Sequence, residues 1–135
     1  KEIKKIAFGN IDTRRDWGFS GDYVNAIWKI LQQKKPDDYV IATGENYSVK
    51  DFIKESFKLV GLDWKDFITY NNAKYLRPSE VQSLQGDATK ALKKLKWKPK
   101  VKFKDLCKMM LEADLKEQGL SLGDAIKLAK DVKKN

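Results

Sequence analysis

The hydrophobic positions in the N-terminal half of the chain predict short strands that alternate with helices. Residues 3–8 form a short apolar run closed by Gly9 and Asn10, which indicates a strand. The next apolar residues recur with the i, i+3, i+4, i+7 spacing of a helix with one buried face: Val24, Ile27, Trp28 and Leu31. Residues 39–44 (YVIATG) are a continuous apolar run ending in glycine, which is typical of a strand covered on both faces.

A helix is predicted directly after this strand. Ser48 and Asp51 have the spacing of a capping box. A helical apolar stripe follows, formed by Val49, Phe52, Ile53, Phe57 and Val60. Residues 66–70 (DFITY) predict another short strand. Residues 75–81 (YLRPSEV) predict a turn, because Pro78 fixes its own backbone and holds the preceding residue extended.

Helical patterns dominate the C-terminal half. Asp87 is the expected cap of a short helix that Trp97 and Pro99 end, and Ser121 with Asp124 opens the last helix. The helix between these two is indicated by the spacing of Leu106, Cys107, Met110 and Leu111. The order of elements predicts a mixed α/β fold with few short strands and a helix-dominated C-terminal half. Its 135 residues are the length of one domain.

The net charge of +9 raises the question of a nucleic-acid partner, but the kind of basic residue argues against one. Only three of the 28 basic residues are arginine, whereas proteins that read bases or phosphates rely on the arginine fork. The most basic stretch, residues 93–104, alternates lysine with large apolar residues. It predicts a helix end and a half-buried strand with one lysine face rather than a nucleic-acid surface.

The composition excludes several kinds of site. Cys107 is the single cysteine and there is no histidine, so no internal disulfide, zinc site or histidine-based catalytic triad is expected. A reducing compartment follows, and the expected location is cytoplasmic. No G-x-G-x-x-G or P-loop motif occurs, so no catalytic, cofactor or metal residues are predicted. No stretch approaches the roughly 20 apolar residues of a membrane helix, and no membrane partner is expected.

The three arginines are the best candidates for a binding site. Arg14 and Arg15 precede a helix and adjoin Asp16, which can hold one guanidinium in place, and Arg77 lies three residues before Glu80. Arginines on two distant loops can clamp a diphosphate, because each fork binds two phosphate oxygens. The same residues can instead be structural ties, Arg15 to Asp16 or a helix end and Arg77 to Glu80. Spacing alone leaves both interpretations open.

A family resemblance rests on three stretches: GNIDTRRDWGFSGDYVNAIW, DDYVIATGENYSVKDFI and KYLRPSEVQSLQGDATKALKKLKWKPKVKFKDL. Together they closely resemble the C-terminal part of the GDP-mannose 4,6-dehydratase family, within the extended short-chain dehydrogenase/reductase group. The resemblance covers residues 6 to about 115. Its R-D-W-G, V-I-A-T-G, R-P-x-E-V and L-x-W-x-P motifs occur in the family's order and spacing.

The resemblance implies a partial enzyme. Residues 1–115 would be its C-terminal substrate-binding part and residues 116–135 a helical extension, with the N-terminal NADP-binding Rossmann half absent. The complete enzyme converts GDP-mannose to GDP-4-keto-6-deoxymannose and water with NADP. Because the family's cofactor loop and catalytic Tyr-x-x-x-Lys belong to the absent N-terminal half, whether this chain is an enzyme is uncertain, and no activity or cofactor is expected for it alone.

The resemblance also assigns substrate-binding residues. Arg15 and Arg77 would face the diphosphate and nucleoside of GDP-mannose, and Glu80 would hold the sugar nucleotide or Arg77. Gly9 and Asn10 would line the nucleoside side.

Two alternatives and one further partner follow. The chain could be part of a related nucleotide-sugar epimerase or dehydratase, or a non-catalytic basic binding module. Without a Rossmann sheet beside it, the strand Tyr39–Gly44 would expose an apolar edge, which predicts self-association.

Overall fold

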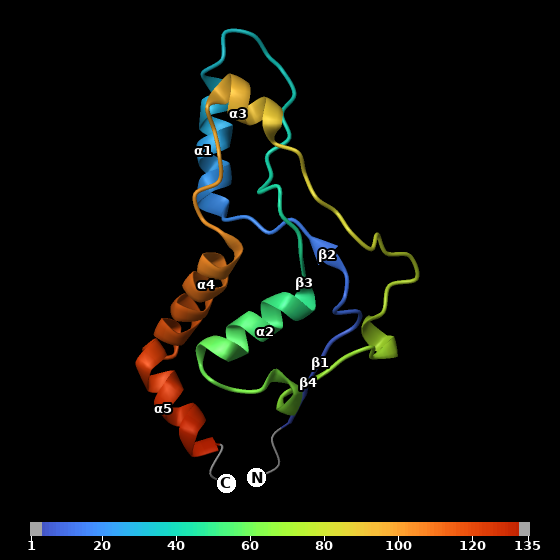
Figure 1. Cartoon of the computed structure of the whole chain (residues 1–135), viewed down its shortest axis with the longest axis vertical. Coiled ribbons are helices and arrows are strands. Elements are labelled where there is room, and N and C mark those ends of the chain that lie inside the picture. Colours follow the sequence, from blue (N-terminus) through green and yellow to red (C-terminus); the bar gives the residue numbers. More distant parts are fainter. Residues whose placement is uncertain (1–3, 133–135) are drawn as a thin grey trace. The chain divides into compact units, whose positions relative to one another are not determined.

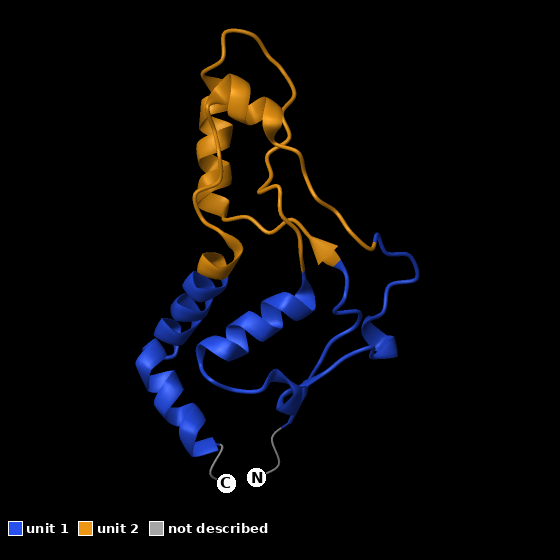
Figure 2. Ribbon diagram, viewed as in Figure 1, with its two compact units in different colours: residues 1–13, 48–81, 107–135 blue, residues 14–47, 82–106 orange. Residues whose placement is uncertain are grey.

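The computed structural model describes residues 4–132, which divide into two compact units (Figure 2). The units are assembled from alternating parts of the described chain: unit 1 from residues 4–13, 48–81 and 107–132, and unit 2 from residues 14–47 and 82–106. The chain length predicted one domain. The structure instead distributes the chain between two units, each with its own hydrophobic cluster.

The elements alternate as the sequence indicates (Figure 1). They are β1 (Ile6–Ala7), β2 (Arg14–Arg15), α1 (Ser20–Leu31), β3 (Tyr47–Ser48), α2 (Val49–Leu59), the 3-10 helix η1 (Trp64–Asp66), β4 (Ile68–Thr69), the 3-10 helix η2 (Ala73–Tyr75), α3 (Thr89–Leu95), α4 (Phe103–Glu117) and α5 (Leu122–Val132). β1 pairs in parallel with β4, and β2 pairs with β3. The predicted mixed α/β class with few short strands and a helical C-terminal half is confirmed.

The core of unit 1 forms where α2 packs on the β1–β4 pair. In that pair Ile6 lies opposite Ile68. The capping box predicted at Ser48 and Asp51 is present, since each backbone N–H donates to the other residue's side chain at 2.9–3.0 Å. It fixes the start of α2, so that the apolar stripe faces inward. The resulting cluster contains Ile11, Ile53, Trp64 and Ile68, with Phe8, Val49, Phe57 and Phe67 packed against it.

The helices α4 and α5 meet at a tight turn. Gly119 has a φ of +71°, a conformation that glycine adopts without strain, and the N–H of Leu120 donates to Leu115. Ser121 and Asp124 cap α5 reciprocally, as predicted. Cys107 of α4 is fully buried, and its burial raises the pKa of the thiol to about 11.

The core of unit 2 forms between α1, α3 and the segment that follows α3 (Figure 1). Its buried residues are Ala26, Ala91, Leu95 and Trp97, and Tyr23, Ile30, Tyr39, Ile41 and Ala88 pack against them. The small alanines let the two helices approach closely, and the indole of Trp97 fills the remaining space. Its ring lies edge-on to that of Tyr23, with centroids 6.3 Å apart.

The helix α1 is where the sequence indicates, but its predicted buried face is exposed. The four residues of that face are exposed in the following fractions: Val24 63%, Ile27 55%, Trp28 60% and Leu31 75%. The residues that α1 buries are Asp22 and Ala26. Periodicity identified an apolar face correctly, but a second apolar face of the same helix contacts the core.

Two predicted strands are also wrong. Residues 39–44 are not a strand in the described structure: Tyr39 and Ile41 pack on the core of unit 2, and Val40 is exposed. No strand of the described residues pairs with this segment, and the N–H groups of Thr43 and Gly44 donate to the side chain of Asp16 instead of to a neighbouring strand. The half-buried strand expected within residues 93–104 is absent because α4 begins at Phe103. Asp87 accepts a hydrogen bond from the N–H of Thr89, although the helix itself starts after Ala88.

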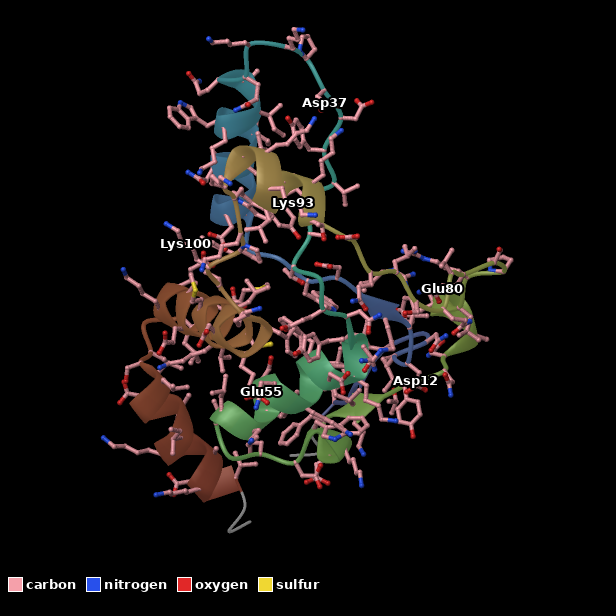
Figure 3. The ribbon with its side chains drawn as sticks, turned by 45° about the horizontal axis from the view of Figure 1, so that its top comes forward. Asp12, Asp37, Glu55, Glu80, Lys93 and Lys100 are labelled. Atoms are coloured by element: carbon pink, nitrogen blue, oxygen red, sulfur yellow. The ribbon has the colours of Figure 1, made fainter. Side chains whose placement is uncertain are left out.

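A buried carboxylate holds the segment between α3 and α4. One oxygen of Asp22 accepts hydrogen bonds from the N–H groups of Lys100 and Val101, at 2.8 and 2.9 Å. The indole N–H of Trp97 donates to the carbonyl of Asp22 at 2.9 Å. Figure 3 shows Lys100 on this segment. Asp22 of α1 therefore accepts three hydrogen bonds from the region between α3 and α4, which forms no strand.

Replacing Asp22 with alanine should destabilise the protein by about 2–4 kcal/mol, because two part-buried N–H groups lose their acceptor. Asp22→Asn retains an acceptor oxygen, so its free energy of unfolding should fall by less than half of the loss in Asp22→Ala. Urea denaturation followed by circular dichroism measures both. Equal losses in the two variants would contradict the prediction that a neutral acceptor oxygen retains most of the stabilisation.

Acid should weaken the ion pairs between Asp37 and α3. Lys90 and Lys94 bind the two oxygens of Asp37 at 2.6 and 2.8 Å, and these contacts hold the pKa of the carboxyl well below its usual value (Figure 3). A lowered folded-state pKa gives stability above the unfolded pKa that is lost as the pH falls. Wild-type protein should therefore lose more thermal stability than Asp37→Asn between about pH 5 and pH 2. Parallel melting-temperature profiles for the two proteins would contradict this.

Candidate functional site

The segment Arg14–Trp17 of unit 2 is held by side chains that reach distant parts of the same unit. The N–H of Arg14 donates to Gln82 and its carbonyl accepts from Leu84, at 2.8 and 3.1 Å. Its guanidinium donates to both the amide oxygen and the carbonyl of Asn46, at 2.9 and 2.8 Å. The amide of Asn46 in turn donates to Ser83. Arg14 thus joins three segments of unit 2.

Asp16 fixes the same segment from the other side. Its carboxylate accepts hydrogen bonds from the N–H and hydroxyl of Thr43 at 2.8 and 2.7 Å, and from the N–H groups of Gly44 and Gly86 at 3.0 and 3.3 Å. A carboxylate with four donors is a strong local constraint. The hypothesis that Asp16 pins a neighbouring arginine is wrong, since its partners are Thr43 and two glycine amides.

Trp17 continues this arrangement. Its indole N–H donates to the carbonyl of Tyr47 at 2.9 Å, and the ring of Tyr47 stacks on Phe103 with centroids 3.9 Å apart. The Tyr47 hydroxyl and the ammonium of Lys102 both donate to Glu45 at 3.1 Å. The bond from Lys102, followed by the one from Tyr47, lowers the pKa of the Glu45 carboxyl. The carboxylate therefore stays ionised in this cluster.

Arg15 lies between these fixed residues. Its guanidinium donates to the carbonyl of Arg14 at 2.8 Å, and the residue is half-buried. Because Arg14 and Asp16 are tied on either side, the backbone at Arg15 has little freedom to move. A guanidinium is a planar fork of N–H donors whose geometry suits a phosphate or a carboxylate.

In unit 1, Gly9 and Asn10 follow β1 and lie against the segment after β4. The N–H of Asn71 donates to the carbonyl of Gly9 at 2.9 Å, and the side chain of Asn10 accepts from the N–H of Asp12 at 2.9 Å. A Cβ atom at position 9 would overlap the carbonyl of Tyr75. Glycine is therefore required here by the close approach of two backbones.

Arg77 and Glu80 lie on the exposed segment that follows η2 (Figure 3). No ion pair joins them among the described residues, so the predicted structural tie between them is wrong. Tyr75, the last residue of η2 before this segment, lies against Gly9. Unit 1 therefore carries Gly9, Asn10, Arg77 and Glu80 on two adjoining segments, whereas Arg15 belongs to unit 2.

Sequence reasoning missed Asp16 and Asn46 as the residues that organise the loop. Their partners lie between 27 and 70 positions away along the chain. No local spacing rule connects residues so far apart. The only sequence signal is the R-D-W-G motif itself.

A hollow of about 330 Å³ in unit 2 lies beside this loop and is lined by residues 42–44, 85–89, 92 and 97–99. Its charged lining residues are Asp87 and Lys98, and none of the predicted site residues lines it. Among the described residues no group of histidine, cysteine, aspartate or glutamate is arranged to bind a metal ion. In residues 4–132 no helix is both long and apolar enough to cross a bilayer.

Comparison with known proteins agrees with the resemblance seen in the sequence. The family model of GDP-mannose 4,6 dehydratase matches residues 1–110. GDP-mannose 4,6 dehydratase 1 of Arabidopsis thaliana is 56% identical over 111 residues, covering 82% of this chain and 30% of the relative. The human GDP-mannose 4,6 dehydratase is 42% identical over 131 residues, covering 84% and 35%. The chain thus spans about a third of the relatives it matches.

Solved structures share the fold. A UDP-glucose 4-epimerase from Thermotoga maritima, solved with UDP-glucose, matches with a TM-score of 0.73 and 27% identity, covering 84% of this chain and 36% of that one. RMD from Pseudomonas aeruginosa, solved with NADPH, matches with a TM-score of 0.68 and 18% identity, covering 79% and 34%.

Glycine at position 9 can be tested against a second glycine. Gly9→Ala should destabilise the protein by about 1–3 kcal/mol, because the new methyl group overlaps the backbone at Tyr75. Gly123→Ala, within α5, has room for its methyl group and should stabilise by about 0.5–1 kcal/mol. Thermal denaturation of the two variants measures the opposite shifts in melting temperature. A neutral Gly9→Ala would rule out the close backbone contact.

Proposed function

We propose that this chain, which belongs to the GDP-mannose 4,6-dehydratase family, forms the part of the enzyme that binds the sugar nucleotide. The complete enzyme converts GDP-mannose to GDP-4-keto-6-deoxymannose and water with NADP. In this proposal residues 1–115 bind substrate and residues 116–135 form a helical extension. The isolated chain binds GDP-mannose through its GDP moiety and does not turn it over.

The observation that carries the proposal is the fixed backbone around Arg15. Arg14 is hydrogen-bonded to Asn46 and Asp16 is hydrogen-bonded to Thr43. The side chains on either side of Arg15 therefore hold the loop in place, and the proposal assigns them no contact with substrate. A guanidinium presented from such a loop loses little conformational freedom when it binds a diphosphate. Two phosphates carry closely spaced oxygens that match the arginine fork.

Residues of unit 1 would contribute the nucleoside contacts. Arg77 is exposed, and the described residues give it no ion pair that a nucleotide would have to displace. Arg77 would face the diphosphate and nucleoside, and Glu80 would hold the sugar nucleotide or Arg77. Gly9 leaves the backbone of its segment without a side chain, and Asn10 supplies a polar amide beside it.

The described residues do not fit the dinucleotide cofactor. No strand among residues 4–132 leads through a G-x-G-x-x-G turn into a helix, which is the arrangement that binds a dinucleotide pyrophosphate. NADP in the complete enzyme would therefore be held by the rest of the family's polypeptide. The steps assigned to this chain are binding and orientation of the nucleotide.

Calorimetric titration with GDP and GDP-mannose tests the proposal. Arg15→Ala and Arg77→Ala should each weaken GDP binding by at least about tenfold, the loss expected for one charge-assisted contact. Arg77→Lys should recover only part of the affinity, because an ammonium cannot form the paired contacts of the fork. Saturable binding that both alanine variants retain would overturn the assignment.

The basic-module alternative predicts a different result. Lys98→Glu reverses a positive charge of unit 2 at a residue that is not one of the proposed GDP-binding residues. A specific nucleotide site should keep its GDP affinity in this variant, whereas a general basic surface would lose affinity there and with rising salt. Self-association of the chain remains a prediction, which sedimentation over a range of concentrations would measure.

A further inference from the structure

The side chain of Asn46 joins two segments of unit 2 and uses both ends of its amide to do so. The amide oxygen accepts a hydrogen bond from Nε of Arg14 at 2.9 Å, and the amide nitrogen donates to the hydroxyl of Ser83 at 2.9 Å. A guanidinium has donors and no acceptor, so the oxygen of the amide has to face Arg14. The two partners together therefore define one orientation of the Asn46 side chain.

The contact between Asn46 and Arg14 is a paired one. Besides the bond to the amide oxygen, Nη2 of Arg14 donates to the backbone carbonyl of Asn46 at 2.8 Å. Two parallel contacts to one residue fix the plane of a guanidinium as well as its position. Arg14 is exposed, and a single hydrogen bond at an exposed site stabilises little because water competes for the donor. The second contact therefore matters for holding this side chain.

The backbone of Arg14 is bonded to the same segment that the amide of Asn46 contacts. Its N–H donates to the carbonyl of Gln82, and its carbonyl accepts from the N–H of Leu84. Ser83, the partner of Asn46, lies between these two residues in the chain. The side chain of Asn46 and the backbone pairing therefore hold the carbonyl of Arg14 in one place.

That carbonyl is the acceptor for the guanidinium of Arg15, at 2.8 Å, so its place sets the place of the arginine fork. We propose that Asn46 is a positioning residue for nucleotide binding, which acts on Arg15 through Arg14 and does not itself contact the nucleotide. This inference rests on the proposed function, in which Arg15 binds the diphosphate of GDP. A fork that is already placed loses less conformational freedom on binding, and Asn46 would supply part of this preorganisation.

A double-mutant cycle in GDP affinity tests the inference. In calorimetric titrations of the full chain, Asn46→Ala should weaken GDP binding by about threefold to tenfold. In an Arg15→Ala background, titrated with GDP in the millimolar range, the same change should alter the affinity by less than about twofold, because the residue that Asn46 positions is gone. Asn25→Ala is the matched control: Asn25 is an exposed residue of α1 in the same unit, and this variant should bind GDP as the wild type does.

The outcomes separate this inference from the proposed function. Wild-type affinity in Asn46→Ala would overturn the inference and leave the GDP site intact. An equal loss of affinity with and without Arg15 would also overturn it, because Asn46 would then act independently of Arg15. A wild-type chain that binds no GDP would overturn the proposed function, and this inference with it.

A second variant keeps the test valid if Asn46→Ala does not fold. Ser83 is exposed, so Ser83→Ala should fold, and it removes the partner of the Asn46 amide nitrogen. The Nε–H of Arg14 should then exchange with water at least about threefold faster than in the wild type. Proton–nitrogen NMR measures this exchange, and single Arg→Lys variants assign the signals of the three arginines. Unchanged exchange together with unchanged GDP affinity in Ser83→Ala would contradict the role of Asn46.

Discussion

The carboxylate of Asp16 is the constraint on which most of unit 2 depends. Its two oxygens accept four hydrogen bonds, from Thr43, Gly44 and Gly86, and so join three parts of the chain that no strand or helix connects. Strands of two residues cannot hold long loops in register by themselves. Side-chain acceptors take over that role here: Asp16 on one side of the loop, Asn46 on the other, and Asp22 where the chain leaves α3. The motif that looks like a ligand site is thus largely a structural device, and only Arg15 within it has a proposed contact with substrate.

The sequence predicted elements better than it predicted what covers them. The capping box at Ser48 and the stripe of α2 led to the observed helix and to its buried face, because both are local properties of consecutive residues. In α1 the same periodicity identified the helix and then the wrong buried face. Periodicity reports that a face is apolar, whereas burial depends on a partner from another part of the chain. The strand predicted at residues 39–44 is absent for the same reason, because a strand needs a neighbouring strand to bond to and an apolar run cannot specify one.

In the candidate site, too, the sequence identified residues better than it predicted their contacts. The family resemblance drew attention to Arg15 and Arg77, and the interpretations of them as ties to Asp16 and Glu80 were tested by geometry. Asp16 turned out to bind backbone amides, and no ion pair joins Arg77 to Glu80 among the described residues. The roles of Asn46 and Gly9 could not be predicted, since each depends on a partner that is close in space and distant in sequence. Such contacts are decided by tertiary packing, and residue type and spacing do not encode them individually.

Unit 2 links the substrate loop to the exposed helix through a short stretch of chain. The loop that carries Arg15 passes through Gly18 directly into α1, where a Cβ atom at Gly18 would overlap the ring of Tyr23. Tyr23 packs on the core with Trp97, and Asp22 beside it holds the segment after α3. A unit of this size buries too little surface to be very stable alone. The contacts that hold α1 on the core are therefore the same few contacts that fix the end of the loop that carries Arg15.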